Sequence, residues 1–263
     1  MNRSTHTSRS APSDLATTTP TTPTTPPTTA DPISSTTPEP PPGHATNTAT
    51  TVAPKPRLRG VLHAATVPLL AAGIIVLIAV APGAGPKTSL AIYLACAMML
   101  FGNSATYHIG NWSPTVKAVL RRIDHSNIYL FVAGTYTPLA VILLSGTSQI
   151  VLLSLIWGLA LAGVLFRTLW LSAPRRLYTA MYVVMGWTAL WWLPQFARAG
   201  GVAIVVLIIV GGVIYSLGAG VYSRKWPDPC PKWFGFHEVF HSCTVLAAAC
   251  HWTAVLLAVR HIM

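Results

Sequence analysis

Charged side chains are scarce in this sequence. Only 9% of its 263 residues are Asp, Glu, Lys or Arg, whereas soluble domains average about 25%. Acidic residues are the rarest, at 6 against 17 Lys and Arg, while 52% of the residues are hydrophobic. A soluble protein of this length needs charge to cover its surface, so the composition argues against an ordinary soluble enzyme.

Cysteine is also rare, and its spacing is uninformative. None of the four cysteines belongs to a Cys-x-x-Cys pair, and all but Cys230 lie in apolar stretches: Cys96, Cys243 and Cys250. We interpret them as small buried hydrophobic residues rather than a disulfide framework or a thiolate metal site.

The first 54 residues differ from the rest of the chain. They hold 11 of the 22 prolines and many threonines, as in Thr17–Thr29. Such a segment cannot bury enough apolar surface to offset the entropy of ordering it. The sequence therefore predicts a disordered Thr/Pro-rich tail over 1–54, interpreted as a flexible leader rather than an O-glycosylated stalk, followed by a membrane domain over 55–263.

Long apolar stretches fill the remainder. Each is near the roughly 20 residues that cross a 30 Å hydrocarbon core, and helices satisfy their own backbone polar groups in lipid. The pattern predicts an all-α integral membrane protein with a seven-transmembrane-helix bundle. The predicted spans lie near 61–81, 88–108, 123–144, 149–169, 177–196, 200–223 and 234–259.

The distribution of Lys and Arg predicts the orientation. With the N-terminus inside and the C-terminus outside, twelve of these residues fall in inner segments and three in outer ones. This is the positive-inside pattern of a multi-pass protein of the cell (plasma) membrane. Topology explains the positive charge, so no nucleic-acid partner is needed, and the tail is expected in the cytoplasm.

Several polar residues stand at membrane depth, where they are costly and usually functional. Two close the second predicted span, one opens the third and three open the seventh, so the topology brings all six to the inner leaflet. They are Ser104, His108, Asp124, His237, Glu238 and His241.

The spacing of the histidines predicts a metal site. His237 and His241 are one helical turn apart, and His108 from a neighbouring span would supply a third nitrogen. Three imidazoles with an open position are typical of catalytic Zn²⁺. Asp124 is the acid best placed to bind or deprotonate a water there, with a helix N-cap as its alternative role.

The remaining polar groups have secondary roles in this hypothesis. Ser104 would hydrogen-bond Asp124 or the substrate, or serve only as a small packing residue. His63 lies at the right depth to support the metal ligands without binding the ion itself, and His125 is interpreted as an interfacial residue.

Residues 237–241 read HEVFH, which matches the H-E-x-x-H pattern of zinc proteases. In that alternative, Glu238 is the general base. Intramembrane zinc proteases take a third ligand from an acid in a later helix, and no acid follows Glu238 in this sequence. A protease is therefore the less favoured alternative.

A broader resemblance covers about four-fifths of the chain. From about Arg59 onward the sequence resembles the hemolysin III family, the bacterial branch of the progestin and adiponectin receptor family. The matching stretches are GNSATYH (102–108), RRIDHSNIYLFVAGTYTPL (121–139), WGLALAGVLFR (157–167), GGVIYSLGAGVYSRKWPDPCPKWFGFHEVFH (211–241) and AAACHWTAV (247–255).

This resemblance implies a seven-helix membrane fold and a zinc site at His108, His237 and His241. It also implies functional roles for Ser104 and Asp124. Glu238 is not among the metal ligands of that family, so it would support the ligands or have a structural role. Relatives include lipid amide hydrolases of the alkaline ceramidase type, so a membrane lipid with an acyl amide is the implied substrate. A non-enzymatic regulator, sensor or transporter with structural zinc stays open. A cytolysin is less favoured, because seven apolar spans leave no soluble form.

Overall fold

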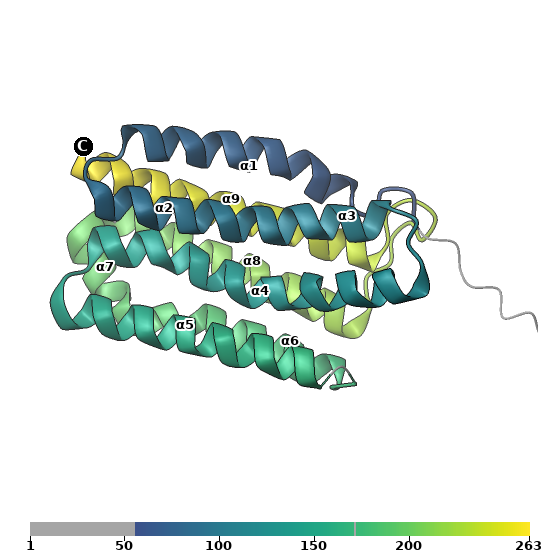
Figure 1. The fold of residues 1–263 in the computed structure, drawn as a ribbon. Helices are drawn as coiled ribbons and strands as arrows, with labels where there is room; N and C mark the ends of the chain where they lie inside the picture. Colours follow the sequence, from purple (N-terminus) through teal and green to yellow (C-terminus); the bar gives the residue numbers. More distant parts are fainter. Residues whose placement is uncertain (1–55, 171) are drawn as a thin grey trace, which may run out of the picture. The chain divides into compact units, whose positions relative to one another are not determined.

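The computed structural model describes residues 56–170 and 172–263, so the predicted tail over 1–54 lies outside the described residues. Within the described part of the chain, the regular elements are helices and no strand is formed. The long helices run alongside one another (Figure 1). The prediction of an all-α fold is therefore confirmed for this part of the chain.

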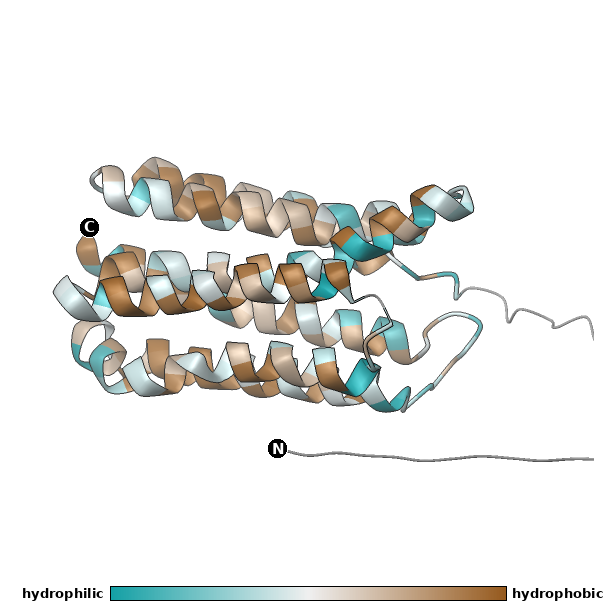
Figure 2. Cartoon of the chain, turned by 60° about the horizontal axis from the view of Figure 1, so that its bottom comes forward, coloured by the Kyte–Doolittle hydropathy of each residue, from teal (hydrophilic) through white to brown (hydrophobic). Residues whose placement is uncertain are grey.

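Six helices in the described residues are long and apolar enough to cross a membrane. Figure 2 shows hydrophobic residues along their middles and more hydrophilic residues toward their ends and loops. The second span is continuous over Ala84–Ile109 and consists of α2, the π-helix η1 and α3. The six spans are α1 (Val61–Val80), Ala84–Ile109, α4 (Pro114–Leu143), α5 (Gly146–Leu169), α8 (Val202–Arg224) and α9 (Phe236–Ile262).

The segment predicted to span over 177–196 has a different form. It is divided into α6 (Arg175–Gly186), the 3-10 helix η2 (Trp187–Trp192) and α7 (Leu193–Gly200), none of which is long enough to span alone. The break frees backbone groups, and Tyr136 binds two of them. Its hydroxyl donates to Gly186 O at 2.6 Å and accepts from Ala189 N at 2.7 Å. The seventh span stays a prediction.

Helix α4 lies at the centre of the bundle, where it contacts α2, α5, α6 and α9. Of its most apolar 18-residue window, 72% is buried, against 22% for α1 and α5. Gly163 of α5 allows close packing, because a Cβ there would lie 2.4 Å from Tyr129 Cδ1. The outer helices instead expose large apolar side chains such as Leu69 and Leu165, as lipid-facing surfaces do.

Helix α4 also corrects a predicted boundary. It begins at Pro114 and not near 123, because Ser113 caps it by accepting from Val116 N and Pro114 occupies the first turn. Its first turns carry Lys117, Arg121 and Arg122, whose charge made this stretch resemble a loop. Asp124 therefore lies within the helix, and the alternative of an Asp124 N-cap is wrong.

Candidate metal centre

The start of α9 is fixed by two carboxylates. Glu238 Oε2 accepts from Gly235 N at 2.8 Å, and Asp228 Oδ1 accepts from Phe236 N at 2.8 Å. Together they satisfy backbone donors that a helix N-terminus leaves unpaired. They also hold in place the first turns of α9, which carry His237 and, one turn later, His241.

The second span carries the opposing histidine on α3 (Asn103–Ile109), just after the π-helix η1 (Met98–Gly102). A π segment disturbs the regular helical hydrogen bonds and is frequent at functional sites. Here Asn127 of α4 donates to the Met99 carbonyl at 2.6 Å. This bond supports the segment that leads to His108.

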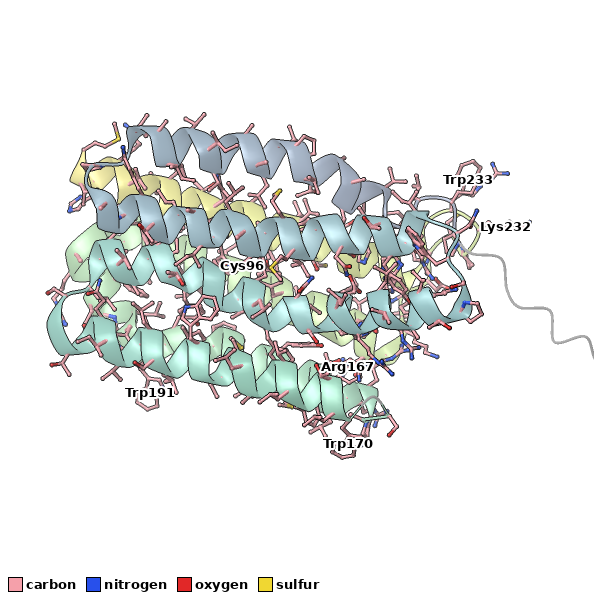
Figure 3. All side chains as sticks on the ribbon, viewed as in Figure 1. Cys96, Arg167, Trp170, Trp191, Lys232 and Trp233 are labelled. Atoms are coloured by element: carbon pink, nitrogen blue, oxygen red, sulfur yellow. The ribbon has the colours of Figure 1, made fainter. Side chains whose placement is uncertain are left out.

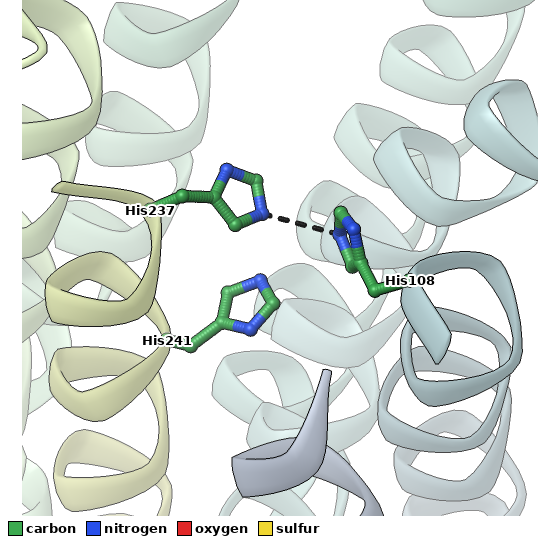
Figure 4. A group of neighbouring side chains, drawn as sticks. All are labelled: His108, His237 and His241. Carbon is green, nitrogen blue, oxygen red and sulfur yellow. Dashed lines mark hydrogen bonds between the residues drawn. The ribbon is translucent and has the colours of Figure 1, made fainter. Parts of the chain in front are cut away.

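Three histidines converge between α3 and α9. His108 Nε2 lies 3.1 Å from His237 Nε2, and one ring nitrogen from each of His108, His237 and His241 lies within 4.8 Å of the other two. Figure 4 shows the rings facing one another across the two helices. His108 and His241 are buried and His237 is half-buried. The proximity that the spacing predicted is present.

Asp124 and Ser104 are also brought together. Both are buried, and the Ser104 side chain hydrogen-bonds to the Asp124 carboxyl group. Ser104 is one turn before His108 on the same helix, so the pair connects α4 to the histidine-bearing span. The functional role of Ser104 stays a prediction.

His63 packs directly against the cluster. It is 3% exposed, and its ring stacks on His241 with centroids 3.8 Å apart and planes 11° apart. Neither ring nitrogen has a hydrogen-bond partner among residues 56–170 and 172–263. A parallel stack presents the ring face to His241, so His63 restrains the orientation of that ring.

Glu238 binds Arg59 and the start of α9. It is 0% exposed, and its Oε1 accepts from Arg59 Nε at 2.8 Å while its other oxygen binds Gly235 N. It is not among the residues that line the central cavity. Both carboxylate oxygens are thus engaged in holding α9 and the chain before α1.

A mostly apolar cavity extends from the histidines along the bundle. On α4 its lining extends from Asp124 to Leu139, which is about 22 Å of helix. Ser104, His63, His237 and His241 line one end. The other end is lined by residues such as Trp187, Leu190, Leu193 and Phe196.

Sequence reasoning missed two polar groups of this cavity. His125, interpreted as interfacial, lines the cavity, and its Nδ1 lies 3.7 Å from Asp124 Oδ2. Its Nε2 lies 3.3 Å from the hydroxyl of Tyr222 on α8. Whether His125 lines the cavity depends on how α4 is rotated about its own axis. The contact with Tyr222 joins two helices, so residue spacing within one helix cannot predict it.

This arrangement defines a class: an all-helical, multi-span membrane protein with a three-histidine cluster at one end of an apolar cavity. The family described as haemolysin-III related matches residues 51–252. The chain belongs to this family, and the resemblance found in the sequence is confirmed.

Comparison with individual proteins gives the same family. The chain is 33% identical over 169 residues to a hemolysin-3 homolog of Bacillus subtilis, covering 64% of this chain and 76% of that protein. It is 36% identical over 107 residues to hemolysin-3 of Bacillus cereus, covering 40% of this chain and 48% of that protein. It is also 24% identical over 187 residues to progestin and adipoQ receptor-like protein 1 of Caenorhabditis elegans, covering 64% of this chain and 43% of that protein.

Proposed function

We propose that His108, His237 and His241 hold Zn²⁺ and that the protein hydrolyses an acyl-amide lipid at this site. The donor set supports the metal: three nitrogens on a tetrahedral zinc stand about 3.3 Å apart, and the His108–His237 pair is at 3.1 Å. The His241 Nδ1 atom is buried without a hydrogen-bond partner among the described residues.

The surrounding residues support hydrolysis. Bound zinc would supply Lewis-acid activation of a water and of the scissile carbonyl. Asp124 accepts the proton that the attacking water loses and returns it to the leaving amine as the C–N bond breaks. Ser104 keeps the Asp124 carboxylate oriented, through the hydrogen bond between them. The apolar cavity beyond them suits an acyl chain.

The observation that carries this proposal is that His237, His241, Asp124 and Ser104 all line one cavity, with His108 completing the three-histidine cluster beside it. The test is release of fatty acid from vesicles that contain an N-acyl lipid, by wild-type protein and by Asp124→Asn. The proposal expects release by the wild type only, with zinc bound to both. Zinc in both proteins without release from any acyl-amide lipid would indicate a non-enzymatic regulator, sensor or transporter.

Lipid-amide hydrolysis and the zinc-protease alternative predict different results for Glu238→Gln. Under our proposal this variant should keep its zinc and its amide hydrolysis, because the Glu238 carboxylate binds Arg59 and Gly235 and not the reacting groups. It should lower the midpoint of thermal unfolding by about 5 °C, since it loses hydrogen bonds to a charged group. A folded, zinc-bound Glu238→Gln protein that has lost all hydrolysis would instead support Glu238 as a general base.

We also propose that the chain crosses the plasma membrane seven times, with the N-terminus in the cytoplasm and the C-terminus outside. The excess of Lys and Arg at the end of the bundle that carries the histidines supports this, and η2 and α7 would complete the span begun by α6. Cysteines introduced after Met263 should react with an impermeant thiol reagent in intact cells. If the cysteines react only after the cells are lysed, the C-terminus lies in the cytoplasm and the proposed orientation is wrong.

A further inference from the structure

One further histidine lies deep within a membrane span, away from the three-histidine cluster. His251 is 15 residues after the first residue of α9 and 11 before its last. It is ten residues beyond His241, which is about 15 Å along the helix. Figure 3 shows the labelled charged residues Arg167 and Lys232 toward one end of the bundle instead. A polar side chain at such depth is costly and usually functional.

The fold accommodates the His251 ring at the wall of the cavity. His251 lines the cavity together with Tyr215 of α8, and the centroids of the two rings are 5.5 Å apart. Gly211 of α8 lies directly against the imidazole, because a Cβ there would be 2.5 Å from His251 Nε2. The imidazole is therefore packed against α8 while it borders the cavity.

One hydrogen bond fixes the tautomer of this imidazole. His251 Nε2 lies 3.3 Å from the carbonyl oxygen of Ile208. A carbonyl oxygen only accepts, so Nε2 carries the hydrogen of this bond. A charged imidazole is costly at membrane depth, and in the neutral ring the second nitrogen then accepts. His251 Nδ1 is therefore an acceptor, which suits a ligand group that donates, such as a hydroxyl.

Tyr215 supplies a second polar group beside His251. Its hydroxyl is buried and has no hydrogen-bond partner among residues 56–170 and 172–263. The Trp187 indole, which also lines the cavity, differs in that its Nε1 donates to Ser216 Oγ at 2.9 Å. An unpaired buried hydroxyl is unfavourable, and a ligand hydroxyl would pair with it.

We propose that His251 and Tyr215 form a binding site for a hydroxyl group partway along the chain of a membrane lipid whose polar end lies at the histidine cluster. The lipid hydroxyl donates to His251 Nδ1 and accepts from the Tyr215 hydroxyl. The apolar lining takes up the methylene groups on either side. The site thus selects a hydroxylated acyl chain over an unsubstituted one. It needs a lipid chain in the cavity but no hydrolysis, so it goes beyond the proposed function.

The chain offers matched variants for this site. His251→Leu removes both ring nitrogens and keeps an apolar side chain of similar volume. His251→Asn places an amide oxygen near the position of Nδ1 and so restores an acceptor. Thr244→Val is the control, because Thr244 lines the same cavity on the same helix and its hydroxyl donates to the Phe240 carbonyl at 3.0 Å.

The experiment measures binding to the detergent-purified full chain through the shift of its thermal unfolding midpoint. The ligands are octadecanoic acid and its 12-hydroxy, 12-oxo and 2-hydroxy derivatives. In an extended chain, the 12-position is about as far from the carboxylate as His251 is from the histidine cluster, roughly 15 Å.

The 12-hydroxy acid should bind about fivefold more tightly than octadecanoic acid to the wild type and to Thr244→Val, which is the usual effect of one hydrogen bond. His251→Leu should lose this preference, and His251→Asn should retain it. Because each preference is a ratio within one protein, a general loss of stability does not imitate it. The readout is binding, so a protein without amide hydrolysis gives the same test.

The 12-oxo acid tests the site in the wild type alone, without any variant that must fold. A ketone only accepts, so it cannot pair with His251 Nδ1 and should bind more weakly than the 12-hydroxy acid. The proposal is overturned if the 12-oxo acid binds as tightly as the 12-hydroxy acid, or if octadecanoic acid does. A stronger preference for the 2-hydroxy acid, or a 12-hydroxy preference that survives in His251→Leu, would overturn it as well.

Discussion

Replacing Asp124 by asparagine is expected to lower the rate of amide hydrolysis by about 10²- to 10⁴-fold, the usual contribution of a positioned acid–base group. Asparagine has nearly the same shape and can still hydrogen-bond to Ser104, so the packing of α4 should survive. It cannot accept the proton that the attacking water loses. The measurement is the single-turnover release of fatty acid from an N-acyl lipid.

The same variant separates hydrolysis from metal binding. Because none of the three proposed ligands is touched, Asp124→Asn should bind zinc as the wild type does. Ser104→Ala is the matched comparison: it removes the hydrogen bond to Asp124 and should cost less, about tenfold, since the carboxylate itself remains. An Asp124→Asn protein that hydrolyses at the wild-type rate would refute the proposed role of Asp124.

Replacing His237 by alanine should remove the metal. Loss of an outer-shell partner of a metal ligand costs 10- to 100-fold in affinity, so loss of a ligand should cost more than about 100-fold. His237 is half-buried and lies in the first turn of α9, so its truncation leaves the packed core of the bundle intact. The measurement is zinc per protein after dialysis against a weak chelator.

His261→Ala is the control for that variant. It removes an exposed histidine from the last turn of the same helix, far from the cluster. The wild type and His261→Ala should retain about one zinc, and His237→Ala should retain less than about a tenth of that. Equal zinc in all three proteins would place the metal elsewhere.

Much of this site was predictable from sequence because depth and helical period are local properties. The apolar stretches fixed which end of each span carries Ser104, His108 and His241, and i, i+4 spacing placed residues of one helix on one face. Hydrophobicity alone could not locate the start of α4, because its first turns are basic and extend beyond the apolar stretch. The alternative of Asp124 as a helix N-cap and the interpretation of His125 as interfacial both followed from that misplaced helix start.

Contacts between distant segments were the part that sequence did not reveal. The Arg59–Glu238 pair joins residues 179 positions apart, and the stack of His63 on His241 joins α1 to α9. Both depend on how helices rotate about their axes as they pack, which no single helix encodes. For the same reason the motif HEVFH suggested a base at Glu238, while the fold directs that carboxylate toward the helix N-terminus.

X-ray absorption at the zinc edge of the purified wild-type protein shows whether the three histidines hold zinc. We expect about one zinc with three imidazole nitrogens at about 2.0–2.1 Å and one further light atom. His237→Ala, supplied with equal zinc, should not reproduce this spectrum. A wild-type protein purified without chelator that holds no zinc, or zinc bound through sulfur, would contradict the three-histidine centre.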